Sequence, residues 1–174
     1  DLTGDWSSDV CSSDLTPLCI LRPGAITIEM LREIDDKIYI DKNVMSKPKN
    51  DFKPKAPGMK YRHYAPKSPV KIICGDLEKT VAKINEIVQT NMGNKKIGII
   101  ATDETKDKYP YGTVISLGSR KHLDSVGRNL FEVLRSFDAT DVDLILSEAF
   151  EEKGIGIAIM NRLKKSAGFD MIEV

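Results

Sequence analysis

The last hundred residues alternate short apolar runs rich in β-branched side chains with longer amphipathic stretches, and this alternation restricts the fold more than any other feature. Strands are expected over 70–74, 97–101, 114–117, 142–146 and 171–174. Apolar residues recur at helical spacing over 77–88 and 123–137, and a last helix is expected over 156–167. Strands joined by helices of this length form crossovers, which favour a parallel sheet covered on both faces. We therefore predict an α/β fold, a three-layer Rossmann-like domain over residues 70–174.

The first 45 residues contain too little regular structure to form a domain of their own. Residues 19–21 are a short apolar strand with no obvious partner, and Thr27 is a suitable N-cap for a short helix over 28–34. A lone strand and a short helix bury too little apolar surface to be stable independently. We interpret residues 1–45 as the end of something larger.

Residues 5–15, DWSSDVCSSDL, have neither a helical nor a strand period. The string resembles the translation of a short-read sequencing adapter, and such processing scars lie outside fold reasoning. The alternative is a genuine loop rich in Ser and Asp. We leave this segment, with Trp6 and Cys11, out of every functional interpretation.

The composition changes sharply between residues 46 and 71. This stretch holds five of the eight prolines and eight basic residues against a single acid, Asp51. Proline removes backbone donors and biases the preceding residue toward extended conformations, which predicts a polyproline-like linker over 46–69. A basic linker would then join two otherwise acidic parts.

Composition and charge exclude several classes of protein. The chain has 174 residues, and Lys plus Arg and Asp plus Glu both total 26, which gives no overall attraction to nucleic acid or to an acidic membrane. No apolar run approaches the roughly 18 residues that would span a bilayer. We interpret the protein as cytoplasmic, with neither nucleic acid nor a membrane as a direct partner. Cys11, Cys19 and Cys74 lack the CxxC spacing of a zinc site.

The α/β region offers weak site candidates. Gly154-Ile155-Gly156 could belong to a phosphate-binding glycine loop, but it lacks a third glycine, so a plain turn before a helix is favoured. A metal role for His122 is not expected, because no Cys or second His stands at ligand spacing. Four residues are candidates for a cluster near the carboxyl ends of strands, but structural capping is favoured for them: Ser147, Glu148, Asn161 and Arg162.

The sharpest motif is PGMKYRHYAP at residues 57–66 of the linker. It places two tyrosines, a histidine and two cations between prolines, so it can offer an aromatic face to a base and donors to phosphates. Two other interpretations stay open. The residues could pin the linker onto a domain surface, or they could bind single-stranded nucleic acid.

The motif PGMKYRHYAP, together with LRPGAIT about forty residues earlier and NRLKKSAG near the end, resembles the two-domain threonylcarbamoyl-AMP synthases. The resemblance covers the whole chain apart from residues 5–15. It implies a parent enzyme that condenses L-threonine, bicarbonate and ATP into threonylcarbamoyl-AMP and pyrophosphate, for threonylcarbamoyladenosine formation in tRNA. It also implies that residues 1–45 are the tail of an α+β catalytic domain.

The resemblance assigns four ATP-binding residues. Arg22 matches the family arginine that meets the ATP phosphates, and His63 matches a second ATP contact, whereas Tyr64 and Tyr61 are weaker candidates for closing the linker over the nucleotide. Mg²⁺ would accompany ATP in the parent enzyme. The family's Lys-x-Arg cluster and serine-rich ATP-binding stretch have no counterpart here, so no catalytic and no metal-binding residue is assigned to this chain.

Three expectations follow from this interpretation. The chain by itself should make no threonylcarbamoyl-AMP, because two contacts cannot replace a preorganised site. The linker should act as a lid over the nucleotide. Residues 70–174 should fold alone, while 1–69 should exchange amide protons rapidly. The competing interpretation is a free-standing α/β domain that binds a small ligand or regulates, preceded by a disordered basic leader.

Overall fold

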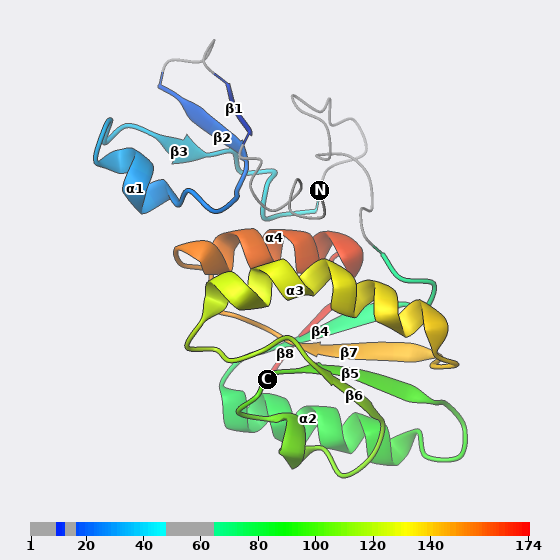
Figure 1. The fold of residues 1–174 in the computed structure, drawn as a ribbon. Coiled ribbons are helices and arrows are strands. Elements are labelled where there is room, and N and C mark those ends of the chain that lie inside the picture. Colours follow the sequence, from blue (N-terminus) through cyan, green and yellow to red (C-terminus); the bar gives the residue numbers. More distant parts are fainter. Residues whose placement is uncertain (1–9, 13–16, 48–64) are drawn as a thin grey trace.

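The computed structural model describes residues 17–47 and 65–174, together with the backbone of residues 10–12. Its central feature is a five-stranded sheet in the order β6-β5-β7-β4-β8, in which every neighbouring pair is parallel (Figure 1). The strands are β4 (Val70–Cys74), β5 (Ile97–Ala101), β6 (Thr113–Ser116), β7 (Leu144–Glu148) and β8 (Met171–Glu173). The predicted α/β fold class is confirmed.

Helices cover both faces of this sheet. Helix α2 (Leu77–Thr90) lies on one face, and α3 (Leu123–Ser136) and α4 (Ile155–Ser166) lie on the other (Figure 1). Asp76 starts α2 because its carboxylate accepts the N–H groups of Glu78 at 2.9 Å and Lys79 at 3.4 Å. Two short 3-10 segments, η1 (Lys106–Lys108) and η2 (Phe137–Ala139), complete this part of the chain.

The predicted apolar stripes face the sheet and form its two core layers. Val126, Leu130 and Leu134 of α3 are almost fully buried on one side. Ile84 of α2 and Ile99 of β5 are fully buried on the other. Each such side chain contributes roughly 1.5–3 kcal/mol when it leaves water, so the two layers hold the helices in place.

The strand expected over 142–146 is displaced by two residues. Val142 is buried, but it lies before the strand, and the ladder runs on through the polar residues Ser147 and Glu148, which pair with Ile72 and Ile73 of β4. Hydropathy alone ends the strand at Leu146. Backbone pairing is indifferent to side-chain polarity, and it extends the strand to Glu148.

The expectation that residues 19–21 lack a partner strand is wrong. Strand β2 (Cys19–Arg22) pairs in parallel with β3 (Tyr39–Ile40) and antiparallel with β1 (Val10–Ser12). β3 has only two residues, too few to give a strand pattern, and β1 lies inside the segment that was left out of the fold. The short helix α1 (Ile28–Arg32) begins as predicted, with the Thr27 hydroxyl accepting the Met30 N–H at 3.4 Å.

The segment 17–47 is held against α4. Ile157 of α4 packs on a cluster formed by Ile20, Ile28 and Ile38. Backbone carbonyls of the segment accept two further bonds from α4, from Asn161 to Val44 and from Lys164 to Met45 at 3.4 Å. The expected rapid exchange of residues 1–69 assumed a strand without a partner, and the structure removes that premise for 17–47.

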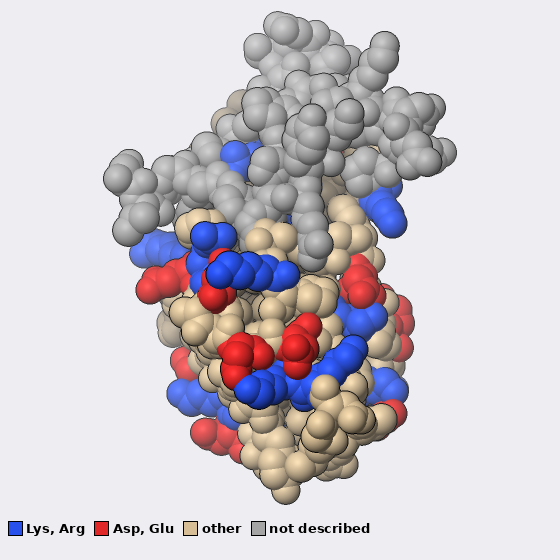
Figure 2. Space-filling model, turned by 90° about the vertical axis from the view of Figure 1, so that its right-hand side faces the viewer, with Lys and Arg blue, Asp and Glu red and all other residues tan. Residues whose placement is uncertain are grey.

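The surface of the α/β region carries charges of both signs. Figure 2 shows Lys and Arg interspersed with Asp and Glu on one face, without a single-sign patch on the described residues visible there. In the described ranges, no helix is long and apolar enough to cross a membrane.

Candidate functional site

Arg22 is the one predicted ATP-binding residue that lies in the described part of the chain. It ends β2 and is half-buried, and Pro23 and Gly24 follow it in a turn whose residues are buried. The other three predicted residues, Tyr61, His63 and Tyr64, lie outside the described residues. The structure therefore gives the position of Arg22 and does not test the predicted roles of the three linker residues.

The turn after Arg22 is anchored by α4. Arg162 donates from Nη1 to the carbonyl oxygen of Pro23 at 3.2 Å and to that of Ala158 at 3.1 Å. Its side chain is buried within the structure, so these bonds are shielded from competing water. The turn after Arg22 is thus held by a contact between Pro23 and Arg162, which are 139 positions apart in the sequence.

Lys165 joins the same electrostatic neighbourhood. Burial first, and then the positive charges of Arg22 and Arg162, together lower the pKa of its ammonium group to about 8. The three side chains come from β2 and from one face of α4, because residues 162 and 165 are one helical turn apart. The three positive charges are close enough to repel one another, and guanidinium and ammonium groups are donors suited to phosphate oxygens. We call Arg22, Arg162 and Lys165 the basic cluster.

Sequence reasoning missed Lys165, although a signal was present. The motif NRLKKSAG places Arg162 and Lys165 on one helical face. Only their burial distinguishes this face from an ordinary solvated one, and the local pattern does not reveal that burial.

The four residues proposed to meet near the strand ends do not form one site. Asn161 and Arg162 contact the segment 17–47. Ser147 donates to the carbonyl of Glu148 at 3.0 Å, and the Glu148 carboxylate accepts from Tyr109 at 2.7 Å and from Arg120 at 2.6 Å. These are two separate groups, and each is engaged in hydrogen bonds within the protein.

The glycine pair before α4 has a packing role. Gly154 has a φ of +53°, and a Cβ on Gly156 would stand 2.0 Å from the carbonyl oxygen of Glu151. The Gly154 N–H donates to the Glu29 carboxylate at 3.3 Å, so it contributes to the docking of the segment 17–47. The pair therefore makes a tight turn and permits a close approach of backbone.

His122 occupies the N-cap position of α3, and its carbonyl accepts the Ser125 hydroxyl at 2.7 Å. Among the described residues, no group of three or more His, Cys, Asp or Glu side chains could hold a metal ion. The Mg²⁺ expected to accompany ATP thus has no carboxylate cage in this part of the chain.

The fold is that of an α/β domain with a parallel sheet, whose last helix, α4, packs against the segment 17–47 and shares the basic cluster with it. The chain belongs to the family of the threonylcarbamoyl-AMP synthase C-terminal domain, whose family model matches residues 26–168. It is 40% identical over 158 residues to the threonylcarbamoyl-AMP synthase of Bacillus subtilis strain 168, which covers 91% of this chain and 43% of that protein.

Solved structures agree with this assignment. The crystal structure of Pyrococcus abyssi Sua5 complexed with L-threonine matches 96% of this chain and 47% of its own, with a TM-score of 0.84 and 39% identity. A second P. abyssi Sua5 structure, of a variant with alanine in place of a consecutive histidine and tyrosine, matches with a TM-score of 0.83, 38% identity, and 96% and 46% of the two chains. The chain thus spans less than half the length of these relatives.

Proposed function

We propose that this chain is the C-terminal part of an enzyme that forms L-threonylcarbamoyl-AMP and pyrophosphate from L-threonine, bicarbonate and ATP, a nucleotidyltransferase acting in tRNA modification. The observation that carries the proposal is the basic cluster, in which the helix of the family's C-terminal domain meets the arginine assigned to the ATP phosphates. Family membership supports the reaction, and the cluster supports a role for these residues in it.

In this proposal Arg22 contacts the ATP phosphates directly. A guanidinium group presents donors in a planar fork that matches phosphate oxygens, and a charge-assisted hydrogen bond contributes roughly 1.5–3 kcal/mol. Arg162 and Lys165 support it, Arg162 through its bond to the Pro23 carbonyl and Lys165 through its positive charge. Bound phosphate would offset the repulsion among the three cations.

The linker residues supply the second ATP contact in this proposal. His63 would bind phosphate, with Tyr64 and Tyr61 closing over the nucleotide. A consecutive histidine and tyrosine were replaced by alanine in one P. abyssi Sua5 structure, and His63-Tyr64 is the one His-Tyr dipeptide of the present sequence. This supports the choice of His63 and Tyr64 as the residues to test. A closed linker would exclude water from an activated carbamoyl-adenylate and so slow its hydrolysis.

We also propose the division of the chain into a tail of the catalytic domain (1–45), a linker (46–69) and an accessory domain (70–174). On this division the catalytic groups are supplied by a domain outside this sequence, and the chain alone makes no product. The burial of segment 17–47 against α4 supports a fixed orientation of the two domains.

The experiment joins residues 17–174 to the part of the B. subtilis protein that lies outside the match, and measures ATP binding by calorimetry. Arg22→Ala and His63→Ala should each weaken ATP binding by about 1–3 kcal/mol, or lower turnover correspondingly. His122→Ala is the matched control and should be silent, because its side chain makes no capping bond. Wild-type affinity and turnover in both the Arg22 and His63 variants would show that the linker is only a tether.

A further inference from the structure

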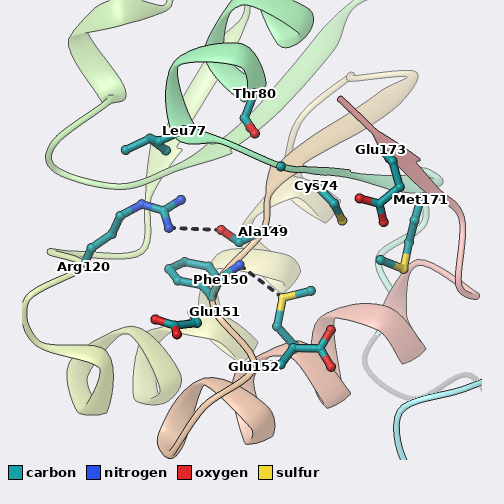
Figure 3. A pocket seen from close by; sticks show the side chains of 12 residues that line it. Cys74, Leu77, Thr80, Arg120, Ala149, Phe150, Glu151, Glu152, Met171 and Glu173 are labelled. Atoms are coloured by element: carbon teal, nitrogen blue, oxygen red, sulfur yellow. Dashed lines mark hydrogen bonds between the residues drawn. The ribbon is translucent and has the colours of Figure 1, made fainter.

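A separate pocket of about 480 Å³ opens at the carboxyl edge of the sheet (Figure 3). It lies beyond the ends of the neighbouring strands β4 and β7, whose next helices, α2 and α4, cover opposite faces of the sheet. This is the point at which the strand order reverses, and doubly wound folds bind ligands in the crevice formed there. Its lining comes from residues directly after both strands, including Gly75, Leu77 and Phe150.

Thr80 supplies a buried polar group that lacks a partner. Its side chain is 2% exposed and lines the pocket, and among the described residues its hydroxyl makes no hydrogen bond. Figure 3 shows the hydroxyl on the pocket side of α2. Buried hydroxyl groups are almost always hydrogen-bonded, so one without a protein partner indicates a partner that enters from the pocket.

Two charged side chains add directional groups. Glu173, at the end of β8, carries its carboxylate into the lining beside Cys74, whose thiol has a pKa raised to about 11 by burial first and by the Glu173 charge second. Arg120 uses three of its five N–H groups, on Thr102, Ala149 and Glu148, and stacks 4.7 Å from the centroid of the Phe150 ring. Two Arg120 donors therefore remain for an occupant.

The charges exclude a phosphate at this position. Asp76 already occupies the N-terminus of α2, where a dinucleotide site would place its pyrophosphate. Three carboxylates line the pocket. Glu152 is paired with Lys164 at 2.5 Å, whereas Glu151 and Glu173 make no ion pair among the described residues. The one cation in the lining, Arg120, is paired with Glu148. An uncharged molecule with hydroxyl donors fits this balance, and an anion does not.

We propose that this pocket binds an uncharged nucleoside. The ribose diol donates to Glu173, since an acid at the end of the strand beside the first strand is the usual ribose acceptor of doubly wound folds. The base lies against the apolar wall of Leu77, Phe150 and Met160, with Thr80 and Arg120 bonding its edge. The volume is in the range of small-molecule sites. The proposal does not rest on the proposed function, because it uses none of the basic cluster.

The test is calorimetry on the 174-residue chain with adenosine, guanosine, cytidine and uridine, each beside its 5′-monophosphate and its 2′,3′-dideoxy form. At least one nucleoside should bind, with the monophosphate at least about tenfold weaker because of the lining carboxylates. Glu173→Gln and Thr80→Val should each weaken the nucleoside by about tenfold or more. Glu132→Gln and Thr90→Val are the matched controls, since neither residue lines the pocket.

The dideoxy forms locate the diol. Removing both hydroxyls should weaken binding to the wild-type chain and have little further effect in Glu173→Gln, because the two changes delete the same contact. The proposal is overturned if no nucleoside binds, if the monophosphates bind equally well, or if neither pocket variant changes affinity in a chain that melts as the wild type does.

Discussion

Nη1 of Arg162 lies 3.2 Å from the carbonyl oxygen of Pro23 and so holds α4 against the turn that follows Arg22. Both residues are buried, and the same arginine helps to lower the pKa of Lys165. One side chain therefore contacts the turn that follows the predicted phosphate-binding arginine and also contributes, after burial and Arg22, to the lowered pKa of Lys165. Each can be tested separately.

Arg162→Met should loosen segment 17–47 and leave the parallel sheet intact. The change removes the donor to Pro23 and leaves a buried carbonyl without it, which costs about 1–3 kcal/mol. Amide exchange at Tyr39 and Asp41, whose N–H groups bond to the carbonyls of Leu18 and Ile20, should accelerate by roughly tenfold or more. Exchange within β5 should not change.

The control for this variant is Arg128→Met, which removes an exposed arginine of α3 that pairs with Asp124 at 3.7 Å. Equal exchange rates at Tyr39 in the Arg162 variant and in the wild type would show that the Pro23 contact does not hold the segment.

Nucleotide binding to the joined enzyme should take up protons near pH 8. Lys165 has a pKa lowered to about 8, because its charged form is unfavourable in the folded protein. The cost of this buried charge to stability is fully present below about pH 8. It disappears as the pH rises from about 8 to the ordinary pKa of 10.5. Bound phosphate would stabilise the charged form and raise the pKa again. Calorimetry in buffers of different ionisation enthalpy should show about half a proton taken up at pH 8 and none at pH 6.

Lys165→Met should abolish this proton uptake, with Lys153→Met as the control at an exposed position. An uptake that persists in the Lys165 variant would assign the proton to another group and separate Lys165 from the nucleotide.

Arg120→Met should destabilise the α/β region by about 3 kcal/mol, because it leaves the carboxylate of Glu148, 1% exposed, without its cation. Glu148→Gln added to that variant should restore part of the loss, since it removes the uncompensated charge and keeps an acceptor for Tyr109. Urea unfolding of the two single variants and the double variant gives the coupling. If the losses in unfolding free energy of the two single variants simply add in the double variant, the Arg120–Glu148 pair contributes no interaction energy to stability.

Acid should weaken the loop that carries Arg120. Burial by itself would raise the pKa of Glu104, but hydrogen bonds from the Ser119 hydroxyl and the Arg120 N–H outweigh it and lower the pKa to about 2. The contribution to stability is complete above the ordinary value of 4.5 and is lost as pH falls toward 2. Glu104→Gln should thus be less stable than the wild type at pH 6, and the difference should shrink below pH 4.5; Glu132→Gln should show no such trend.

Much of the parallel sheet and its helices could be predicted. The apolar residues that the helices bury recur at helical spacing, and most of the strands are short apolar runs, so both are visible in the local sequence. The last helix was expected over 156–167 and runs from Ile155 to Ser166. The features that the sequence did not predict depend on pairing between strands that are far apart in the chain. The two residues of β3 acquire strand geometry only through β2, and the polar end of β7 is a strand only because β4 pairs with it.

The candidate site divides in the same way. Arg22 could be identified from its motif. The bond from Arg162 to Pro23 and the effect of the Arg22 charge on Lys165 join residues more than a hundred positions apart, which no local pattern reveals. Thr80 gives no signal in the sequence, since a threonine in the first turns of a helix is ordinary. Its meaning comes from its 2% exposure and its missing partner among the described residues.

Pyrophosphate release tests most directly whether this chain completes an enzyme that makes threonylcarbamoyl-AMP. Residues 17–174 joined to the part of the B. subtilis protein outside the match should release pyrophosphate only when ATP, L-threonine and bicarbonate are all present, while the 174-residue chain alone should release none. Activity of the joined protein that requires all three substrates is the predicted result. Release by the chain alone, or a joined protein that folds and binds ATP but makes no product, would contradict the account.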